Sequence, residues 1–321
     1  MPIIAPSYKA KGLFKNGHFS TIYSAKLRPV PQAVYNRKRL ELPDGDFVDI
    51  DWSYSKQPTT KVAILLHGLE GNAHRVYIQG QAKKLVENGW DVAAMNHRGC
   101  SGEENRLYLS YNSGRTKDLH LLTTSIVEKD RYAQISLIGF SLGGNLVLKY
   151  LGERETVFKQ IKNCAAISSP LYLKGSLESL MKFENWVYRT TFILDLKQKY
   201  KRKMKFFPDK MSKAELKKIK TLLDFDSFYT APAHGFKDAY EYYEKSSSLQ
   251  YVPNIKTPVL LLNALNDTFL SKKCYPKELA SQSKYLYLET PKHGGHVGFH
   301  INNKEYYSEK RTLDFINEPR N

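Results

Sequence analysis

The stretch that decides the fold is Ile135–Gly144, which reads ISLIGFSLGG. It opens with an apolar run typical of a short buried strand, and apolar residues at helical spacing follow from Asn145 to Leu151. Between them stands the pattern Gly-x-Ser-x-Gly, whose glycines permit a turn tight enough to expose the hydroxyl of Ser141 above the strand end. A purely structural Gly-rich turn is the alternative, but the strand before the pattern and the helix after it favour a nucleophilic serine.

Short apolar runs alternate with helix-spaced segments on both sides of this stretch. Continuous apolar strands separated by amphipathic helices are typical of a mostly parallel sheet with helices on both faces. The sequence therefore predicts a single α/β domain over residues 1–321. Its further strands are predicted at Val62–Leu66, Asp91–Met95, Cys164–Ile167, Pro258–Leu262 and Tyr285–Leu288, and its helices at Val76–Val86, Lys117–Val127 and Glu305–Ile316.

The segment before the first of these strands has a different pattern. Arg37–Leu42 and Phe47–Trp52 alternate apolar and polar residues on either side of the turn Pro43–Asp46, which contains a glycine. This arrangement is typical of an antiparallel hairpin. We therefore predict that the chain opens with a β-ribbon at one edge of the sheet.

The middle of the chain lacks strand signals. We predict that residues 170–252 form a helical cap inserted into the domain, with helices at Leu177–Phe192 and Lys213–Leu223 around a lysine-rich stretch, Lys197–Lys205. Aromatic residues of the cap are candidates for lining a pocket, although packing of the cap on the body is their more ordinary role. These residues are Phe183, Trp186, Tyr188, Phe192, Phe228 and Tyr229.

Composition restricts the class of protein. Hydrophobic residues are 41% of the chain and charged residues 25%, which fits a globular protein and excludes a disordered, collagen-like or coiled-coil chain. Forty-nine Lys and Arg against 32 Asp and Glu give a net charge of +17, which favours anionic partners. The apolar runs are too short to span a bilayer and Met1–Pro6 lacks signal-peptide features, so we predict a cytoplasmic protein. Three cysteines without CxxC spacing predict neither a disulfide framework nor a zinc site.

A serine hydroxyl becomes an effective nucleophile when an imidazole accepts its proton and a carboxylate orients that imidazole. The segment just after the strand ending at Leu262 contains one carboxylate, Asp267, and the segment after the strand ending near Leu288 contains histidines. Serine, aspartate and histidine thus each follow a predicted strand, at the sheet edge where ligands bind. A simple turn role is the alternative for Asp267, but its position after a buried strand favours the catalytic acid.

Three histidines, His293, His296 and His300, compete for the role of base. We choose His296, because the paired glycines Gly294 and Gly295 before it let the loop fold back toward the serine. A metal site is the alternative reading of three neighbouring histidines. The glycines disfavour a helix that would align them, and no acidic residue stands between them, so we predict no metal.

Acyl chemistry also needs hydrogen-bond donors for the oxyanion. The backbone N–H of Leu142, directly after the serine, is one candidate, and that of Leu69, after the strand Val62–Leu66, is the other. His67 is expected to be a buried histidine that supports the second loop. A polar loop, Asn96–Arg106, is expected to line or brace the site.

Several segments carry a resemblance to a known family: His67–Gly71 (HGLEG), Arg98–Gly102 (RGCSG), Ser141–Asn145 (SLGGN) and Gly294–Phe299 (GGHVGF). They resemble the α/β-hydrolase superfamily and, more narrowly, its YheT-like branch of ester hydrolases, with matches from Gly17–Phe19 to the last helix. The resemblance implies an α/β-hydrolase fold with Ser141 as nucleophile, Asp267 as acid and His296 as base. It also implies activity on short or medium acyl esters, cleavage of acyl lipids or acyl transfer.

The chain departs from this family pattern at two positions. Relatives often carry paired aspartates where Asn266 and Asp267 stand, which leaves Asp267 as the sole candidate acid. Asn112 stands where a histidine is common, a change that leaves the proposed triad intact but bears on substrate preference.

The sequence favours a serine hydrolase that cleaves a small-molecule acyl ester through an acyl-enzyme, without a cofactor. A thioesterase, peptidase or acyltransferase is open on the same residues, because one fold hosts many chemistries. A different class is a peripheral protein that docks on an anionic membrane through its basic cap and retains only a vestigial site. No nucleic-acid-binding motif accompanies the charge, so no nucleic-acid partner is expected. The oligomeric state is left open.

Overall fold

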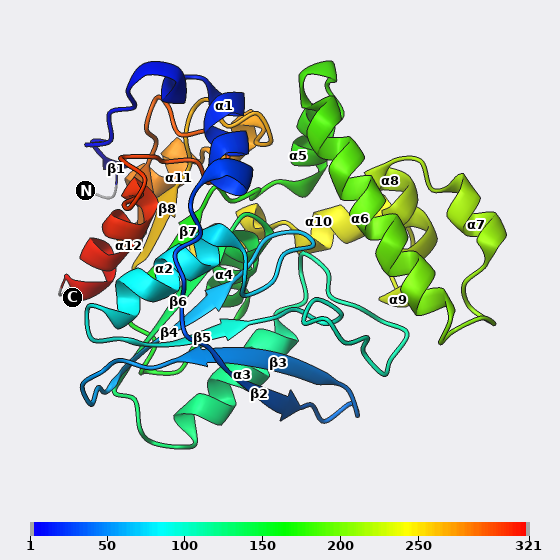
Figure 1. The fold of residues 1–321 in the computed structure, drawn as a ribbon, viewed down its shortest axis with the longest axis horizontal. Coiled ribbons are helices and arrows are strands. Elements are labelled where there is room, and N and C mark those ends of the chain that lie inside the picture. The colour runs from blue at the N-terminus through cyan, green and yellow to red at the C-terminus, as the bar shows by residue number, and fades with distance from the viewer. Residues whose placement is uncertain (1–2, 319–321) are drawn as a thin grey trace.

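The computed structural model describes residues 3–318 and is built on one nine-stranded sheet (Figure 1). Residues 1–2 and 319–321, which the predicted domain includes, lie outside the described residues. The strand order is β1-β9-β8-β7-β6-β4-β5-β3-β2, and the pairs β2–β3 and β3–β5 are antiparallel while the others are parallel. The predicted mostly parallel sheet is therefore confirmed. The strands are β1 (Ile3–Ile4), β2 (Asn36–Glu41), β3 (Phe47–Ser53), β4 (Lys61–Leu66), β5 (Asp91–Met95), β6 (Gln134–Phe140), β7 (Cys164–Ile167), β8 (Val259–Leu262) and β9 (Leu286–Glu289).

Helices cover both faces of the sheet, as the continuous apolar strands predict. Alternate residues of β4 belong to two different cores: Val62 and Ile64 pack in one, and Ala63 and Leu65 in the other. Helices α3 (Lys117–Val127), α4 (Leu142–Glu153) and α11 (Lys277–Gln282) contribute to the first core, whereas α2 (Val76–Val86) and α12 (Tyr307–Asn317) contribute to the second. Because both faces are buried, the strand ends and their loops are the parts left available for a site.

The start of the chain differs from the prediction. The hairpin β2–β3 does form one edge of the sheet, but β1 precedes it and pairs in parallel with β9 at the opposite edge. A short helix, α1 (Gly17–Ile22), lies between β1 and the hairpin in the sequence. The expectation that the chain opens with the ribbon is therefore wrong, because a strand of two residues is too short to show an alternating pattern.

Helices between β7 and β8 cover one end of the sheet and stand to the right of it in Figure 1. The helix predicted at Leu177–Phe192 is instead two helices, because the chain turns at the buried residue Asn185, whose side chain donates to Ser179 O and Thr268 O. The helix predicted at Lys213–Leu223 is also broken, because Thr221 caps a new helix by accepting from Asp224 N at 3.1 Å. The cap helices are α5 (Leu173–Leu180), α6 (Trp186–Met204), α7 (Lys213–Lys218), α8 (Leu222–Phe225), α9 (Ala231–Ala233) and α10 (Ala239–Ser246).

Candidate active site

Ser141 lies on a strained turn between β6 and α4. Its φ of 53° and ψ of −122° form a backbone conformation that residues with a side chain rarely adopt. Its N–H donates to Ile167 O at 2.8 Å, which ties the turn to β7. A Cβ atom at Gly139 would collide with the backbone of Gly143, and one at Gly143 would collide with the backbone of Leu66. The pattern Gly-x-Ser-x-Gly is thus explained by lack of space for side chains around the serine.

Asp267 and His296 form a hydrogen-bonded pair from the loops that follow β8 and β9. His296 Nδ1 lies 2.8 Å from Asp267 Oδ2, and the carboxylate side chain is completely buried. A carboxylate only accepts hydrogen bonds, so Nδ1 carries the proton and, in a neutral ring, Nε2 is an acceptor. The backbone N–H of Phe269 donates to the other carboxylate oxygen at 3.0 Å. The pair therefore has the arrangement in which an acid orients a base.

The other two candidate histidines lie elsewhere. His293 is partly buried, with Nδ1 2.9 Å from Lys15 O. His300 stacks on Phe14 with ring centroids 3.7 Å apart. Neither residue lines the cavity that contains Ser141, whereas His296 does. The spacing of the three histidines along the chain could not show which one is the base, because this depends on how the loop folds.

The N-terminal helix α1 supports the loop of His296, and sequence reasoning missed this role. His296 N donates to Thr21 Oγ1 at 2.8 Å, and Gly295 N donates to Asn266 Oδ1 at 2.9 Å. Gly295 has φ 56°, and a Cβ atom there would collide with the carbonyl of Gly17. The signal that could have identified the support is the family match at Gly17, at the start of α1.

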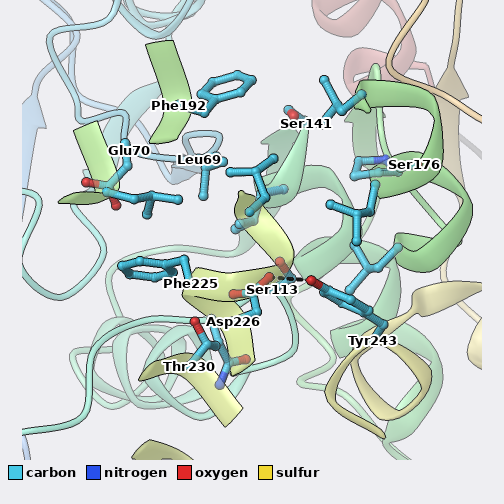
Figure 2. Close-up of a pocket in the computed structure, with 18 of the residues that line it drawn as sticks. Leu69, Glu70, Ser113, Ser141, Ser176, Phe192, Phe225, Asp226, Thr230 and Tyr243 are labelled. Atoms are coloured by element: carbon cyan, nitrogen blue, oxygen red, sulfur yellow. Dashed lines mark hydrogen bonds between the residues drawn. The ribbon is translucent and has the colours of Figure 1, made fainter. Parts of the chain in front are cut away.

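Ser141 and His296 line the same cavity of about 140 Å³ beneath the cap, and Figure 2 shows Ser141 on its wall. Within residues 3–318, no hydrogen bond joins the serine hydroxyl to the imidazole. Proton transfer between them requires the hydroxyl and His296 Nε2 to come within hydrogen-bond distance. The structure thus joins the acid to the base and places the base and the nucleophile on one cavity.

Most of the cavity wall is apolar and comes from the cap. Of the six aromatic residues predicted as candidates, Phe192 and Tyr229 line the cavity. Phe183 and Trp186 are exposed instead, because a hydrophobic pattern does not reveal which face of a helix turns inward. Sequence reasoning missed most of the remaining apolar wall, which includes Leu173, Leu177, Leu180, Leu196, Leu222, Phe225, Phe269 and Leu270.

Two backbone N–H groups at the cavity are available as donors. Leu69 and Leu142 both line the cavity, and neither N–H has an acceptor in the part of the chain from residue 3 to residue 318. The neighbouring N–H groups are occupied: Gly68 N donates to Tyr77 Oη at 3.0 Å and Glu70 N to Tyr111 Oη at 2.8 Å. Two unoccupied donors on loops after β4 and β6 suit an oxyanion.

His67 supports the loop of Leu69 from below. It is 1% exposed, with Nδ1 2.7 Å from Gly68 O, and its Nε2 accepts from His97 N at 3.1 Å. Burial and the neighbouring His97 ring hold the pKa of His67 well below its usual range. The ring is therefore neutral with both nitrogens occupied, which fits a supporting residue and leaves no nitrogen for proton transfer.

The loop after β5 braces the body. Arg98 is buried and donates to Asp118 at 2.8 Å, to Asp44 at 2.9 Å and to Asp46 at 3.1 Å. Cys100, two residues later, is not activated, since burial raises the pKa of its thiol to about 12. The part of this region that reaches the cavity is Ser110–Ser113, beyond the predicted loop.

Taken together, the sheet, the strained serine turn and the Asp267–His296 pair define an α/β hydrolase. The family model described as "Serine aminopeptidase, S33" matches residues 57–284. The chain belongs to this α/β-hydrolase family and, within the superfamily, is YheT-like.

Relatives and solved structures agree with this assignment. The chain is 32% identical to the "Putative esterase YheT" of Escherichia coli over 292 residues, covering 89% of this chain and 85% of that protein. It is 25% identical to "Phospholipase ABHD3" of Mus musculus over 306 residues, covering 93% of this chain and 74% of that protein. A Pyrococcus furiosus esterase structure aligns with a TM-score of 0.57 at 17% identity, over 98% of this chain and 97% of that one. The chain is thus a hydrolase of the esterase and lipase type.

Proposed function

We propose that this protein hydrolyses carboxylic esters through an acyl-enzyme formed on Ser141. The serine oxygen attacks the ester carbonyl while His296 Nε2 accepts its proton, and Asp267 holds the imidazole in the tautomer that can accept. The oxyanion accepts hydrogen bonds from the N–H groups of Leu69 and Leu142. His296 then protonates the departing alcohol, and a water molecule, deprotonated by His296, attacks the acyl group to release the acid and restore the serine.

The observation that carries this proposal is the shared cavity of Ser141 and His296, with the imidazole bound to Asp267. The apolar wall suits an acyl chain, so we propose short or medium acyl esters or lipid-like esters as the substrate class. We also propose that the cap over residues 170–252 acts as a lid. The names of relatives, an esterase and a phospholipase, support ester chemistry over peptide cleavage.

The test is Ser141→Ala against p-nitrophenyl esters from acetate to octanoate. We expect the variant to lose activity by about 10⁴-fold or more, because the nucleophile is gone. Its circular dichroism and melting temperature should match the wild type, which controls for folding. A variant as active as the wild type would end the proposal. Adding alcohols and thioesters to the same assay separates hydrolysis from acyl transfer and thioesterase activity.

A second candidate, compatible with the first, is docking of the cap on an anionic membrane. Helix α6 lines the cavity with Phe192 and Leu196, whereas Trp186 and Leu194 on the same helix are 52% and 55% exposed, and Phe183 just before it is 85% exposed. The last turn of α6 carries basic residues. Exposed aromatic residues at the start of α6 and basic residues in its last turn together favour the interface of an anionic bilayer. Within residues 3–318, none of the helices combines the length and hydrophobicity needed to span a bilayer.

Sedimentation with phosphatidylserine vesicles tests this docking. We expect salt-sensitive binding that Phe183→Ser with Trp186→Ser weakens by about 10-fold, because aromatic area no longer enters the interface. The matched control is Val34→Ser, which removes an apolar side chain that is 87% exposed on the segment before β2. No binding at low salt, or equal loss in the control, would contradict the docking.

A further inference from the structure

A buried lysine of the cap reaches the loop that carries the proposed oxyanion donor. Lys199 projects from α6 toward the body, and its side chain is 3% exposed. Its ammonium group donates to Glu70 Oε1 at 2.6 Å, and the Glu70 side chain is 8% exposed. The same ammonium nitrogen lies 4.3 Å from the centroid of the Tyr111 ring. The positive charge of Lys199, a cap residue, thus contacts Glu70, the residue that follows Leu69.

The contacts of Glu70 hold both its side chain and its backbone. Tyr111 Oη donates to Glu70 Oε1 at 2.7 Å, and Glu70 N donates to the same hydroxyl at 2.8 Å. Glu70 has φ 48°, in the left-handed region, which is unfavourable for a residue with a side chain. Such a conformation persists only when its surroundings enforce it. Glu70 borders the Leu69–Glu70 peptide, which is next to the Gly68–Leu69 peptide that carries the Leu69 N–H, so the contacts that hold Glu70 restrain the loop beside this donor.

We propose that Lys199 is a positioning residue that holds Glu70 and thereby aims the Leu69 N–H at the oxyanion. The oxyanion hole is then complete only when α6 of the cap is seated on the body. Cap closure would assemble the catalytic site as well as cover it. This inference rests on the proposed ester hydrolysis, since it assigns a role within that reaction.

The competing reading is that Lys199 merely fastens the cap to the body. Lys203, one turn further along α6, provides the matched control. It is 2% exposed and donates to Leu107 O at 2.6 Å, so it too joins the cap to the body through a buried ammonium group. None of its contacts reaches the Leu69 loop within residues 3–318. If both lysines only fasten the cap, substituting either one should have similar effects on catalysis. If Lys199 positions the Leu69 loop, substituting Lys199 should lower catalysis more than substituting Lys203.

The experiment compares Lys199→Met with Lys203→Met in the full chain. For each variant, kcat and KM are measured on p-nitrophenyl butyrate. Inhibition constants are measured for hexyl trifluoromethyl ketone, which forms an oxyanion on the serine, and for the corresponding trifluoromethyl alcohol, which fills the cavity without forming one. We expect Lys199→Met to lower kcat and weaken ketone inhibition by a common factor of about 10²-fold, with KM and alcohol inhibition within about threefold. Lys203→Met should leave all four values within about threefold.

Equal loss of kcat in both variants, or ketone inhibition unchanged in Lys199→Met, would overturn the positioning role. Absence of hydrolysis in the wild type would instead overturn the proposed function, so the two failures are distinguishable. If Lys199→Met does not fold, the double variant Lys199→Met with Glu70→Gln removes both charges and leaves no unpaired buried carboxylate. The same four measurements on the double variant then decide the question.

Discussion

Two ionisable side chains in this molecule, Arg98 and His296, follow strands of the same sheet but differ in how many of their nitrogens have a partner. Arg98, after β5, has a fully buried side chain whose Nε and both terminal nitrogens donate to carboxylates. His296, after β9, bonds Asp267 through Nδ1, but its Nε2 has no partner among residues 3–318 and the ring lines a cavity. A guanidinium whose nitrogens all bind carboxylates holds the structure together, whereas an imidazole nitrogen without a partner on a cavity can exchange a proton. The comparison therefore separates bracing residues from those proposed to react.

The substitution with the largest expected effect on the proposed reacting residues is Asp267→Asn. The amide keeps the shape of the side chain but favours the wrong imidazole tautomer, so we expect kcat on p-nitrophenyl butyrate to fall by about 10⁴-fold. The free energy of unfolding, measured by urea denaturation, should change far less than kcat. A variant that unfolds readily while its folded fraction retains normal kcat would place Asp267 among the bracing residues.

Arg98→Met should show the reverse pattern. Removing the guanidinium leaves the buried carboxylate of Asp46 without its ion-pair partner and leaves Asp118 paired only with Arg115, which we expect to cost about 3–5 kcal/mol of unfolding free energy. The kcat of the protein that remains folded should stay within a few-fold of the wild type. Lys245→Met, which breaks an exposed pair with Glu241, is the control and should change the unfolding free energy far less than Arg98→Met. A large fall in kcat without loss of stability would give Arg98 a direct part in the reaction.

Asp226 is an intermediate case, because it lines the cavity but also accepts from Tyr243 Oη at 2.7 Å, a contact on the cavity wall in Figure 2. Burial raises the pKa of this carboxyl to about 6. A raised folded-state pKa means that the contribution to stability is complete below the unfolded pKa and is lost as pH rises through about 6. The variant Asp226→Asn has no titrating carboxyl at this position, so it does not lose this contribution to stability as pH rises. We therefore expect the unfolding free energy of wild type minus variant to fall by up to about 3 kcal/mol between about pH 4 and pH 7.

Urea denaturation of both proteins across this pH range measures the difference. The decisive result is whether the difference in unfolding free energy between wild type and variant falls or rises with pH, since a paired and ionised carboxylate would make it rise. A difference that is flat or rises with pH would show that the fold accommodates the charge.

The body of the protein follows closely from its sequence, and the cap does not. The strand at Asp91–Met95 and the helices at Val76–Val86 and Lys117–Val127 lie where the pattern predicts them, because burial on both faces leaves a continuous apolar run and each helix has one buried face. In the cap, the predicted helix Leu177–Phe192 is broken at Asn185, whose amide finds partners both in α5 and beyond β8. Local pattern could not foresee a break set by a residue so distant in sequence.

The candidate active site also has one part that the sequence predicts and another part that only the folded structure reveals. The amino-acid sequence by itself predicted the glycine-bounded turn at Ser141, because the pattern lies within a few adjacent positions and a Cβ at Gly139 would collide with nearby Gly143. Only the tertiary structure decided that His296 and not His293 or His300 meets Asp267, that every side-chain nitrogen of Arg98 has a carboxylate partner, and that Lys199 reaches Glu70. These are contacts between segments far apart in the chain, and their geometry depends on how whole layers pack, which no local spacing records.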